Sequence, residues 1–178
     1  MKALTTAATL LLSASSIASA EPAAVPKPGP EVEQLAYYIG SWEGHGETKA
    51  GPFGAAGKLS SHMNCTWFTG GFQVLCEGEE TGPSGTRKFL NVIAYDEETK
   101  AYTEYSISNL GESEYDKGGE LNGNKLSWLV DHPAGAKSAK FRYTETRVSP
   151  ALMTYAAEVS VDGAPWASLA QGEIKKVK

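Results

Sequence analysis

Hydrophobic and polar residues alternate along most of the chain, in short stretches that end at glycine, proline, asparagine or aspartate. A two-residue period is typical of strands with one buried face, and no helical period follows residue 40. The expected strands are 41–48, 57–68, 72–80, 87–95, 101–110, 113–121, 125–130, 139–148, 151–161 and 165–175. Short loops between successive strands predict antiparallel neighbours. Ten strands exceed what a flat sheet usually sustains, so we expect a closed up-and-down barrel.

One short helix is predicted ahead of the strands, over residues 31–38. Pro30 precedes it, acidic residues occupy its first turn, and Gly40 ends it. The expected fold is therefore all-β: a single closed antiparallel barrel of about ten strands with one N-terminal helix, occupying residues 31–178. Trp42 has an inward position on the first strand, and we expect it to close one end of this barrel.

The first thirty residues do not follow the strand pattern. A basic start precedes an apolar run over residues 3–12, and the segment ends Ala18-Ser19-Ala20. This layout is typical of a secretory signal peptide over residues 1–20, cleaved between Ala20 and Glu21, and the run is too short to span a membrane. Residues 21–30 hold four prolines, which predicts an extended leader. We therefore expect a periplasmic or secreted protein.

Cys65 and Cys76 lie at equal distances on either side of Gly70-Gly71. In a hairpin centred there they are directly opposite, and a four-residue loop over 69–72 places them at a non-hydrogen-bonded pair, where side chains stand closest. In an oxidising compartment we expect a structural disulfide. The alternative is a redox couple, although such couples usually occupy Cys-x-x-Cys at the start of a helix.

Composition and charge exclude several classes of function. The 178 residues include 41% hydrophobic residues, enough for one domain with a core, and carry 21 acidic against 16 basic side chains. Nucleic acid needs a surplus of Lys and Arg, so no such partner is expected. Glu43, His45 and Glu47 share one face of the first strand, opposite Trp42. We interpret that face as solvated, which predicts neither a metal site nor a membrane-embedded barrel.

No motif assigns a catalytic residue: a nucleophile elbow, a phosphate-binding glycine loop and His-Glu-x-x-His are all missing from the sequence. Inward-facing aromatic side chains are instead expected to fill or line the lumen. This aromatic set is Trp67, Tyr105, Trp128, Phe141, Tyr143, Tyr155 and Trp166. Glu145 and Arg147 share a face with Tyr143 and are candidates for a polar anchor. The alternative is that this end of the strand emerges into water.

Three stretches resemble, in order, a family of secreted bacterial proteins of unknown function with a lipocalin-like (calycin) barrel. They are residues 39–46 (IGSWEGHG), residues 65–76 (CTWFTGGFQVLC), and Ala94-Tyr95-Asp96 with Tyr102. The resemblance spans Pro30 to about Glu173 and implies a fold without an established activity.

The opening stretch also resembles nitrobindins, which are haem-binding ten-stranded barrels with a histidine ligand late in the chain. His45, His62 and His132 all precede the last three expected strands, so we expect no haem and no other cofactor.

Fold analogy implies a binding protein for a small hydrophobic or amphipathic ligand held in the barrel lumen. The candidate ligand-binding residues are Trp67, Tyr105, Trp128, Tyr143, Glu145, Arg147 and Tyr155. Two alternatives remain open. A filled barrel would act as a protein-interaction module through its loops or outer face, and an enzyme would use the lumen as its active site, with Glu145 and a tyrosine as acid and base.

Overall fold

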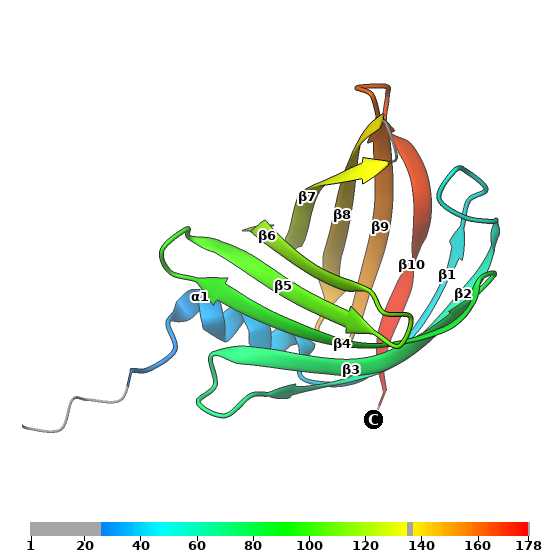
Figure 1. The fold of residues 1–178 in the computed structure, drawn as a ribbon. Coiled ribbons are helices and arrows are strands. Elements are labelled where there is room, and N and C mark those ends of the chain that lie inside the picture. Colours follow the sequence, from blue (N-terminus) through cyan, green and yellow to red (C-terminus); the bar gives the residue numbers. More distant parts are fainter. Residues whose placement is uncertain (1–25, 135–136, 178) are drawn as a thin grey trace, which may run out of the picture.

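The protein folds as one closed ring of ten antiparallel strands, as the computed structural model shows for residues 26–134 and 137–177 (Figure 1). The expected signal peptide, its cleavage site and the first half of the leader lie outside these described residues. The strands are β1 Gly40–Thr48, β2 Gly57–Trp67, β3 Gln73–Gly82, β4 Gly85–Asp96, β5 Ala101–Ser108, β6 Ser113–Asn122, β7 Lys125–Ala134, β8 Lys137–Ser149, β9 Leu152–Val161 and β10 Ala167–Val177. Each pairs with its neighbours in sequence, and β1 pairs with β10 to close the ring. The predicted all-β barrel is confirmed.

The expected helix is present as two short helical turns, α1 (Pro30–Glu33) and a 3-10 helix, η1 (Gln34–Tyr38). Hydrogen bonds tie these turns to strands around the barrel. The Trp42 Nε1 donates to the Tyr38 carbonyl at 2.6 Å, the Tyr102 hydroxyl donates to the Glu31 carbonyl at 2.9 Å, and the Lys176 Nζ donates to the Tyr37 carbonyl at 3.2 Å. Because β1, β5 and β10 all hold it, the helix closes one end of the barrel.

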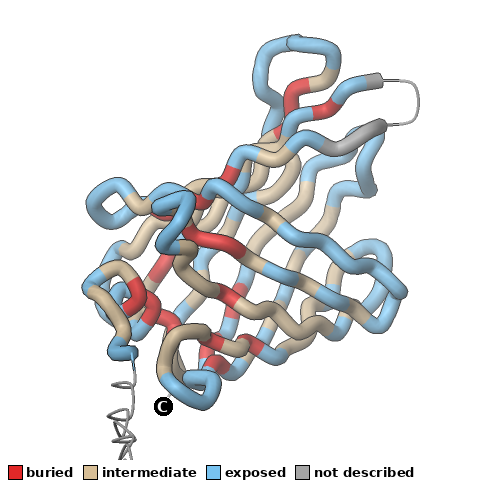
Figure 2. The backbone as a smooth tube through the Cα atoms, turned by 60° about the vertical axis from the view of Figure 1, so that its left-hand side comes forward, coloured by how far each residue is buried: buried red, intermediate tan, exposed pale blue. Residues whose placement is uncertain are grey.

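Buried side chains concentrate at this closed end, and most buried positions lie toward the helix (Figure 2). Eight side chains with at most 2% exposure form its centre: Leu35, Tyr38, Trp42, Cys65, Val74, Cys76, Leu126 and Met153. Trp42 has 1% of its surface exposed, which confirms the prediction that it helps to close one end of the barrel. We call this cluster the closed end.

The predicted disulfide joins Cys65 and Cys76, which stand directly opposite each other on β2 and β3. The Phe68 N–H donates to the Gln73 carbonyl at 2.8 Å, so the hairpin has the expected four-residue loop. Hydrogen-bonded and non-hydrogen-bonded pairs alternate along an antiparallel ladder. Cys65 and Cys76 lie three pairs beyond Phe68 and Gln73, so they form a non-hydrogen-bonded pair.

The seam between β6 and β7 is the least paired part of the ring. These strands are in register at only three positions, from Glu120↔Ser127 to Asn122↔Lys125, and they diverge beyond them (Figure 1). On the other side of β6, the register shifts between Tyr102↔Gly119 and Glu104↔Asp116, so β6 carries one extra residue. Gly118, with φ of +79°, takes part in this bulge.

Candidate functional site

A cavity of about 400 Å³ occupies the lumen beside the closed end. Its lining side chains come from β3 to β8 and from the loop between β5 and β6: Glu80, Arg87, Asn91, Glu104, Ser106, Glu112, Glu114, Asp116, Trp128, Tyr143 and Glu145. We call this cavity the lumen chamber. Its floor lies at the helix, because the carboxylate of Glu145 accepts a short hydrogen bond from the Tyr38 hydroxyl. The lumen is therefore not filled by side chains.

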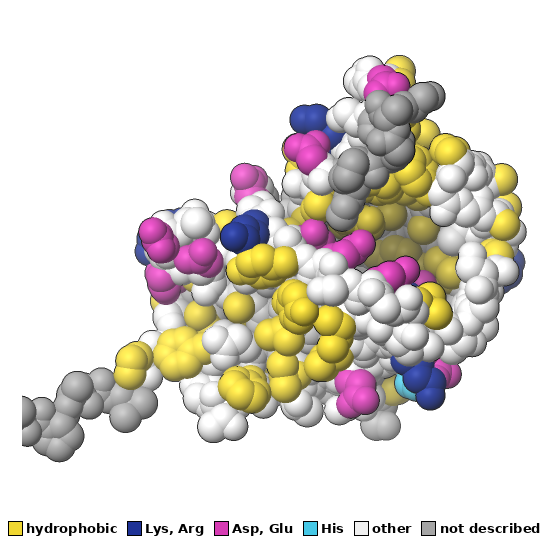
Figure 3. Space-filling view, viewed as in Figure 1, with side chains coloured by type: hydrophobic (Ala, Val, Ile, Leu, Met, Phe, Trp, Pro, Cys, Tyr) yellow, Lys and Arg dark blue, Asp and Glu magenta, His cyan; other side chains and the backbone are white. Residues whose placement is uncertain are grey.

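A second cavity, of about 290 Å³, lies at the open end of the barrel. Its apolar lining includes Phe53, Leu59, Leu110 and Leu169, from loops and strand ends. The ring of Phe53 packs against Phe141 on β8 at a centroid distance of 5.1 Å. The open end is visible as a hollow with yellow side chains inside it and magenta side chains along its near edge (Figure 3). We call this second cavity the mouth.

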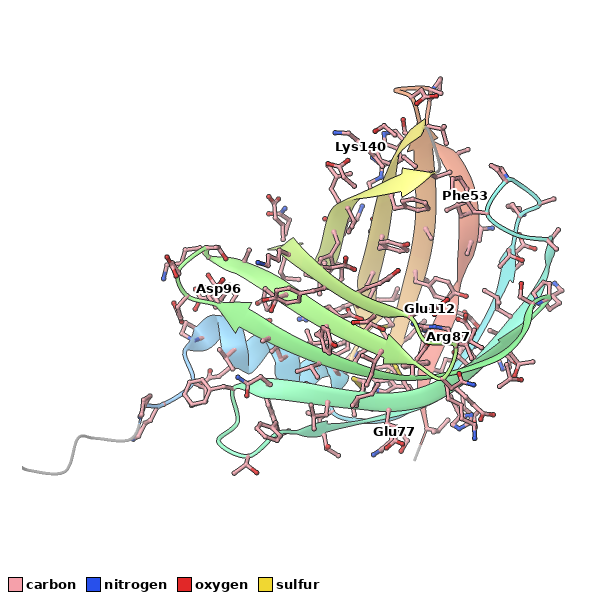
Figure 4. The ribbon with its side chains drawn as sticks, viewed as in Figure 1. Phe53, Glu77, Arg87, Asp96, Glu112 and Lys140 are labelled. Carbon is pink, nitrogen blue, oxygen red and sulfur yellow. A yellow bond between two sulfur atoms is a disulfide. The ribbon has the colours of Figure 1, made fainter. Side chains whose placement is uncertain are left out.

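The mouth and the lumen chamber adjoin, because both are lined by Glu80, Arg87 and Glu112. Arg87 and Glu112 lie close together on the inner side of the strands (Figure 4), and the Arg87 Nε donates to the Glu112 Oε2 at 2.9 Å. The ion pair therefore lies at the junction between the apolar mouth and the polar chamber.

Hydrogen bonds continue from the ion pair into the chamber. The Arg87 Nη2 donates to the Ser106 Oγ at 3.2 Å, and that hydroxyl donates to the Asn91 Oδ1 at 2.8 Å. The Asn91 Nδ2 in turn donates to the Glu104 Oε1 at 2.6 Å. Such a connected network fixes the side chains of one wall and leaves the opposite wall, with Trp128 and Tyr143, aromatic.

The chamber holds carboxyl groups that ionise with difficulty. Burial, together with the nearby Glu145 and Asp116, raises the pKa of Glu104 to about 8, against the opposing effect of Arg87. Burial also raises the pKa of Glu145, against the opposing effects of the Tyr38 hydrogen bond and of Arg147. The pKa of Glu80 is raised by burial as well, although Arg87 opposes the rise. Glu104 therefore retains its proton at neutral pH.

Four of the predicted binding residues lie along the inner face. Trp128, Tyr143 and Glu145 line the lumen chamber. Tyr155 pairs with Glu145 across β8 and β9, and its ring rests against Gly46 and Gly172 of the wall. A Cβ at Gly46 would lie 2.1 Å from the Tyr155 hydroxyl oxygen, so the glycine makes room for the ring.

Arg147 is at the closed end and not in the lumen chamber. Its guanidinium lies over the rings of Tyr37 and Tyr38, at 4.7 Å and 5.5 Å, and its Nη1 donates to the Gln34 Oε1 at 3.4 Å. Its Nε and Nη2 are buried and have no hydrogen-bond partner among the described residues. Arg147 acts on Glu145 through its charge, without an ion-pair contact, so the expected Glu145–Arg147 anchor is not formed as a pair.

Two aromatic residues that were expected inside lie outside, and a third lies at a strand end. Tyr105 is 42% exposed and packs against Tyr115, because the alternation along β5 turns Glu104 and Ser106 inward. Trp166 stacks on Arg142, 4.4 Å from its guanidinium, outside the lumen. The predicted inward orientation of both is wrong. Trp67 shares the face of the cysteines but ends β2 and is 37% exposed, away from the lumen chamber.

Apart from Glu145, the sequence analysis does not predict the acidic side chains that line the chamber. Glu80 follows Cys76 by four residues on the same strand, so simple alternation already placed it on the inner face. Glu114 and Asp116 were harder to find, because the extra residue at the β6 bulge reverses their orientation relative to Gly119.

In the part of the chain that the structure describes, no group of three or more His, Cys, Asp or Glu side chains is arranged to hold a metal ion. Glu47, on the outer face, instead pairs with Lys49 and accepts a hydrogen bond from Gln171. No helix among the described residues is long and apolar enough to cross a membrane.

Comparisons with known proteins support the family and the fold. Residues 27–176 match the model of a family described as protein of unknown function (DUF1579), whereas no curated protein matches the chain. The solved structure of Rv2717c from M. tuberculosis is similar, with a TM-score of 0.58 and 11% identity over 84% of this chain and 99% of that one. The S-type phycobiliprotein lyase CPES from Guillardia theta has a TM-score of 0.53 and 11% identity over 82% of this chain and 92% of that one. The expected family of unknown function is confirmed, and the chain belongs to the DUF1579 family.

Proposed function

We propose that the protein binds a small amphipathic molecule in the barrel lumen. The observation that carries the proposal is the continuity of the two cavities, which share Glu80, Arg87 and Glu112. The apolar part of the ligand would lie in the mouth, against Phe53 and Leu169, and its polar end would lie in the lumen chamber. A concave site with an apolar wall and a few convergent polar groups is typical of small-molecule binding.

The mouth is lined by apolar side chains and the chamber by polar ones. Of the two ligand classes expected from the sequence, hydrophobic and amphipathic, this difference favours the amphipathic class. A wholly apolar molecule would strip water from the carboxyl groups of the chamber without giving them hydrogen bonds, which is costly. A wholly polar molecule would gain nothing from the apolar lining of the mouth. Only a ligand with both characters satisfies both parts of the lumen.

The proposed location is the periplasm or the extracellular medium. The disulfide between Cys65 and Cys76 supports this location, because such bonds persist in oxidising compartments. It is also consistent with the signal peptide that the sequence predicts for residues 1–20.

Two adjacent alanines on β9 allow a test of the binding site. Ala157 pairs with Tyr143 of the chamber on one side and with Ala170 of the mouth on the other, so its side chain faces the junction of the two cavities. Ala156 faces the outer surface. We expect Ala157→Phe to block the lumen and Ala156→Phe to leave it open.

The probe is N-phenyl-1-naphthylamine, a neutral dye with two apolar aromatic groups and one N–H donor, whose fluorescence rises when it leaves water. We expect saturable binding to the wild-type protein, an affinity at least about tenfold lower for Ala157→Phe, and no change for Ala156→Phe. Thermal unfolding of both variants checks that they fold. Equal binding by the two folded variants, or no saturable binding by the wild type, would contradict the proposal.

A further inference from the structure

We infer that the ligand end held in the lumen chamber is a cation, an amine or a guanidinium group. The inference rests on the proposed function and names the chemical class of its ligand. Two features of the chamber carry it: the acidic side chains of its lining, and the aromatic side chains of its remaining wall.

The lining is strongly acidic. Six carboxyl groups face the chamber: Glu80, Glu104, Glu112, Glu114, Asp116 and Glu145. Among the described residues of this lining, Arg87 is the only Lys or Arg, and it is already bonded to Glu112 at 2.9 Å. Ionised carboxyl groups gathered around one cavity repel one another, and a cation placed between them relieves that repulsion and favours the ionised form of groups such as Glu104.

The acidic side chains surround the chamber instead of lying on one patch. Glu80 comes from β3, Glu104 from β5, Glu114 and Asp116 from β6, and Glu145 from β8. The bulge of β6 is what turns its two acidic residues inward. Carboxyl groups on several sides of one small cavity can contact a single ammonium or guanidinium group together.

The remaining wall is suited to the same ligand. The rings of Trp128 and Tyr143 line the chamber, and the faces of aromatic rings attract cations. Trp128 is only 5% exposed, yet its Nε1 has no hydrogen-bond partner among the described residues. This Nε1 lies against Gly119 of the barrel wall, where an added Cβ would be 2.6 Å away, so Tyr143, which is 37% exposed, provides the ring that is open to a cation.

An anionic end group fits the chamber poorly. It would lie among the six carboxyl groups, and the second guanidinium of this region does not line the cavity. Arg147 is held behind the floor, over the Tyr37 and Tyr38 rings. The chamber therefore selects against carboxylate, sulfate and phosphate end groups.

The test uses three probes with the same tail: octylamine, octyl glucoside and octanoate. Isothermal titration calorimetry at pH 8.5, below the micellar concentrations, compares their binding to the wild-type protein. At this pH Glu104 is largely ionised and octylamine still carries its charge. We expect octylamine to bind about tenfold more tightly than octyl glucoside, and octanoate to bind the most weakly.

Matched variants locate the effect. Glu104→Gln keeps the shape of the side chain and removes its charge, so we expect about a tenfold loss of octylamine affinity and no change for octyl glucoside. Glu77→Gln is the control, since Glu77 pairs with Leu90 and Asn64 on the outer side of the sheet, away from the chamber (Figure 4). If Glu104→Gln does not fold, Glu114→Gln tests the same charge at a more exposed position.

The outcomes separate the inference from the proposed function. Similar affinities for all three probes, abolished by Ala157→Phe, would overturn the cationic class and leave lumen binding intact. Tightest binding of octanoate would also overturn the inference. If Glu104→Gln and Glu114→Gln both bind octylamine as tightly as the wild type does, the cationic group does not lie in the chamber and the inference is overturned. If the wild type binds none of the three probes, both proposals are overturned.

Discussion

The closed end and the lumen chamber belong to the same ring of strands but contain opposite kinds of side chain. At the closed end Leu35 and Leu126 are fully buried, and Trp42 and Met153 are 1% exposed. In the chamber the inward positions hold carboxyl groups, and Tyr143 is 37% exposed. Apolar packing therefore holds one end together and leaves the other end free to carry polar groups that a core would not tolerate.

The comparison shows where the barrel can accommodate function. Side chains that face the lumen add little to stability when they stay solvated, so their chemistry can be chosen for a ligand. Glu145 and Tyr38 join the two regions, because the carboxylate of the chamber accepts its hydrogen bond from the helix.

Replacing Trp42 gives the largest expected effect and tests the comparison directly. We expect Trp42→Ala to lower the free energy of unfolding by about 3–5 kcal/mol, because it leaves a cavity in the closed end and removes the hydrogen bond to the Tyr38 carbonyl. Tyr143→Ala, in the chamber, should cost about 1 kcal/mol or less. Urea unfolding of both variants measures the difference. Similar losses would mean that the chamber is part of the core.

Removal of the disulfide is the second prediction. The Cys65→Ala/Cys76→Ala double variant should lose about 3 kcal/mol of stability in the chain-entropy model, since the bond closes a loop of only moderate length. Chemical unfolding with and without reductant provides the measurement, and the double variant should show no response to reductant. A loss of dye binding without a loss of stability would link the disulfide to the lumen and not to the closed end.

The third prediction concerns the pH dependence of stability. Glu104 has a folded pKa of about 8 against an ordinary value of 4.5. Between these values the folded protein binds more protons than the unfolded chain, so this group's contribution to stability falls as pH rises from about 4.5 to 8. The full difference between the two pKa values corresponds to about 5 kcal/mol, and the partial exposure of Glu104 reduces it. Glu104→Gln cannot lose a proton, and we expect it to exceed the wild type by about 1–2 kcal/mol at pH 9 and to match it near pH 4.

Unfolding curves across this pH range measure the effect, and Glu77→Gln serves as the control on the outer face. Parallel pH profiles for the wild type and Glu104→Gln would show that water solvates the chamber fully.

The ion pair of the mouth should have the smallest effect. Glu112 and Arg87 are part-exposed, with 50% and 30% of their side-chain surfaces accessible, so Glu112→Gln should change stability by about 0.5 kcal/mol or less. Thermal unfolding checks this value. A loss above about 1 kcal/mol would instead make the mouth a structural element of the barrel.

Local sequence signals were sufficient for the fold. The strand that carries Trp42, Gly44 and Gly46, the cysteines placed around Gly70-Gly71 and the turn residues between strands each specify structure over a few residues. The boundaries differ mostly by one or two residues, because strand ends depend on their partners. β7 and β8 extend further than predicted, since their pairing continues through Pro133↔Ser138.

The candidate site was less predictable, because one irregularity in a strand changes the direction in which all the following side chains point. One extra residue at the bulge near Gly118 reverses which side chains of β6 face the lumen, and nothing in the local pattern marks this change. Tyr105 was placed inside because a large aromatic residue normally seeks burial, whereas here Glu104 takes the inward position. Charged residues inside a barrel contradict the rule that otherwise identifies the core.

The closure of β1 on β10 at eight positions, from Ser41↔Val177 to Thr48↔Ala170, sets a constraint on the order of folding. The helix and Trp42 are synthesised first, but Lys176, which lies over the Trp42 ring, belongs to the last strand. The packing of the closed end is therefore completed only after the final eleven-residue strand has been synthesised and has paired with β1. A chain that lacked this strand would be an open sheet with β1 and β9 as unpaired edges, and such edges are templates for association with other unfinished chains.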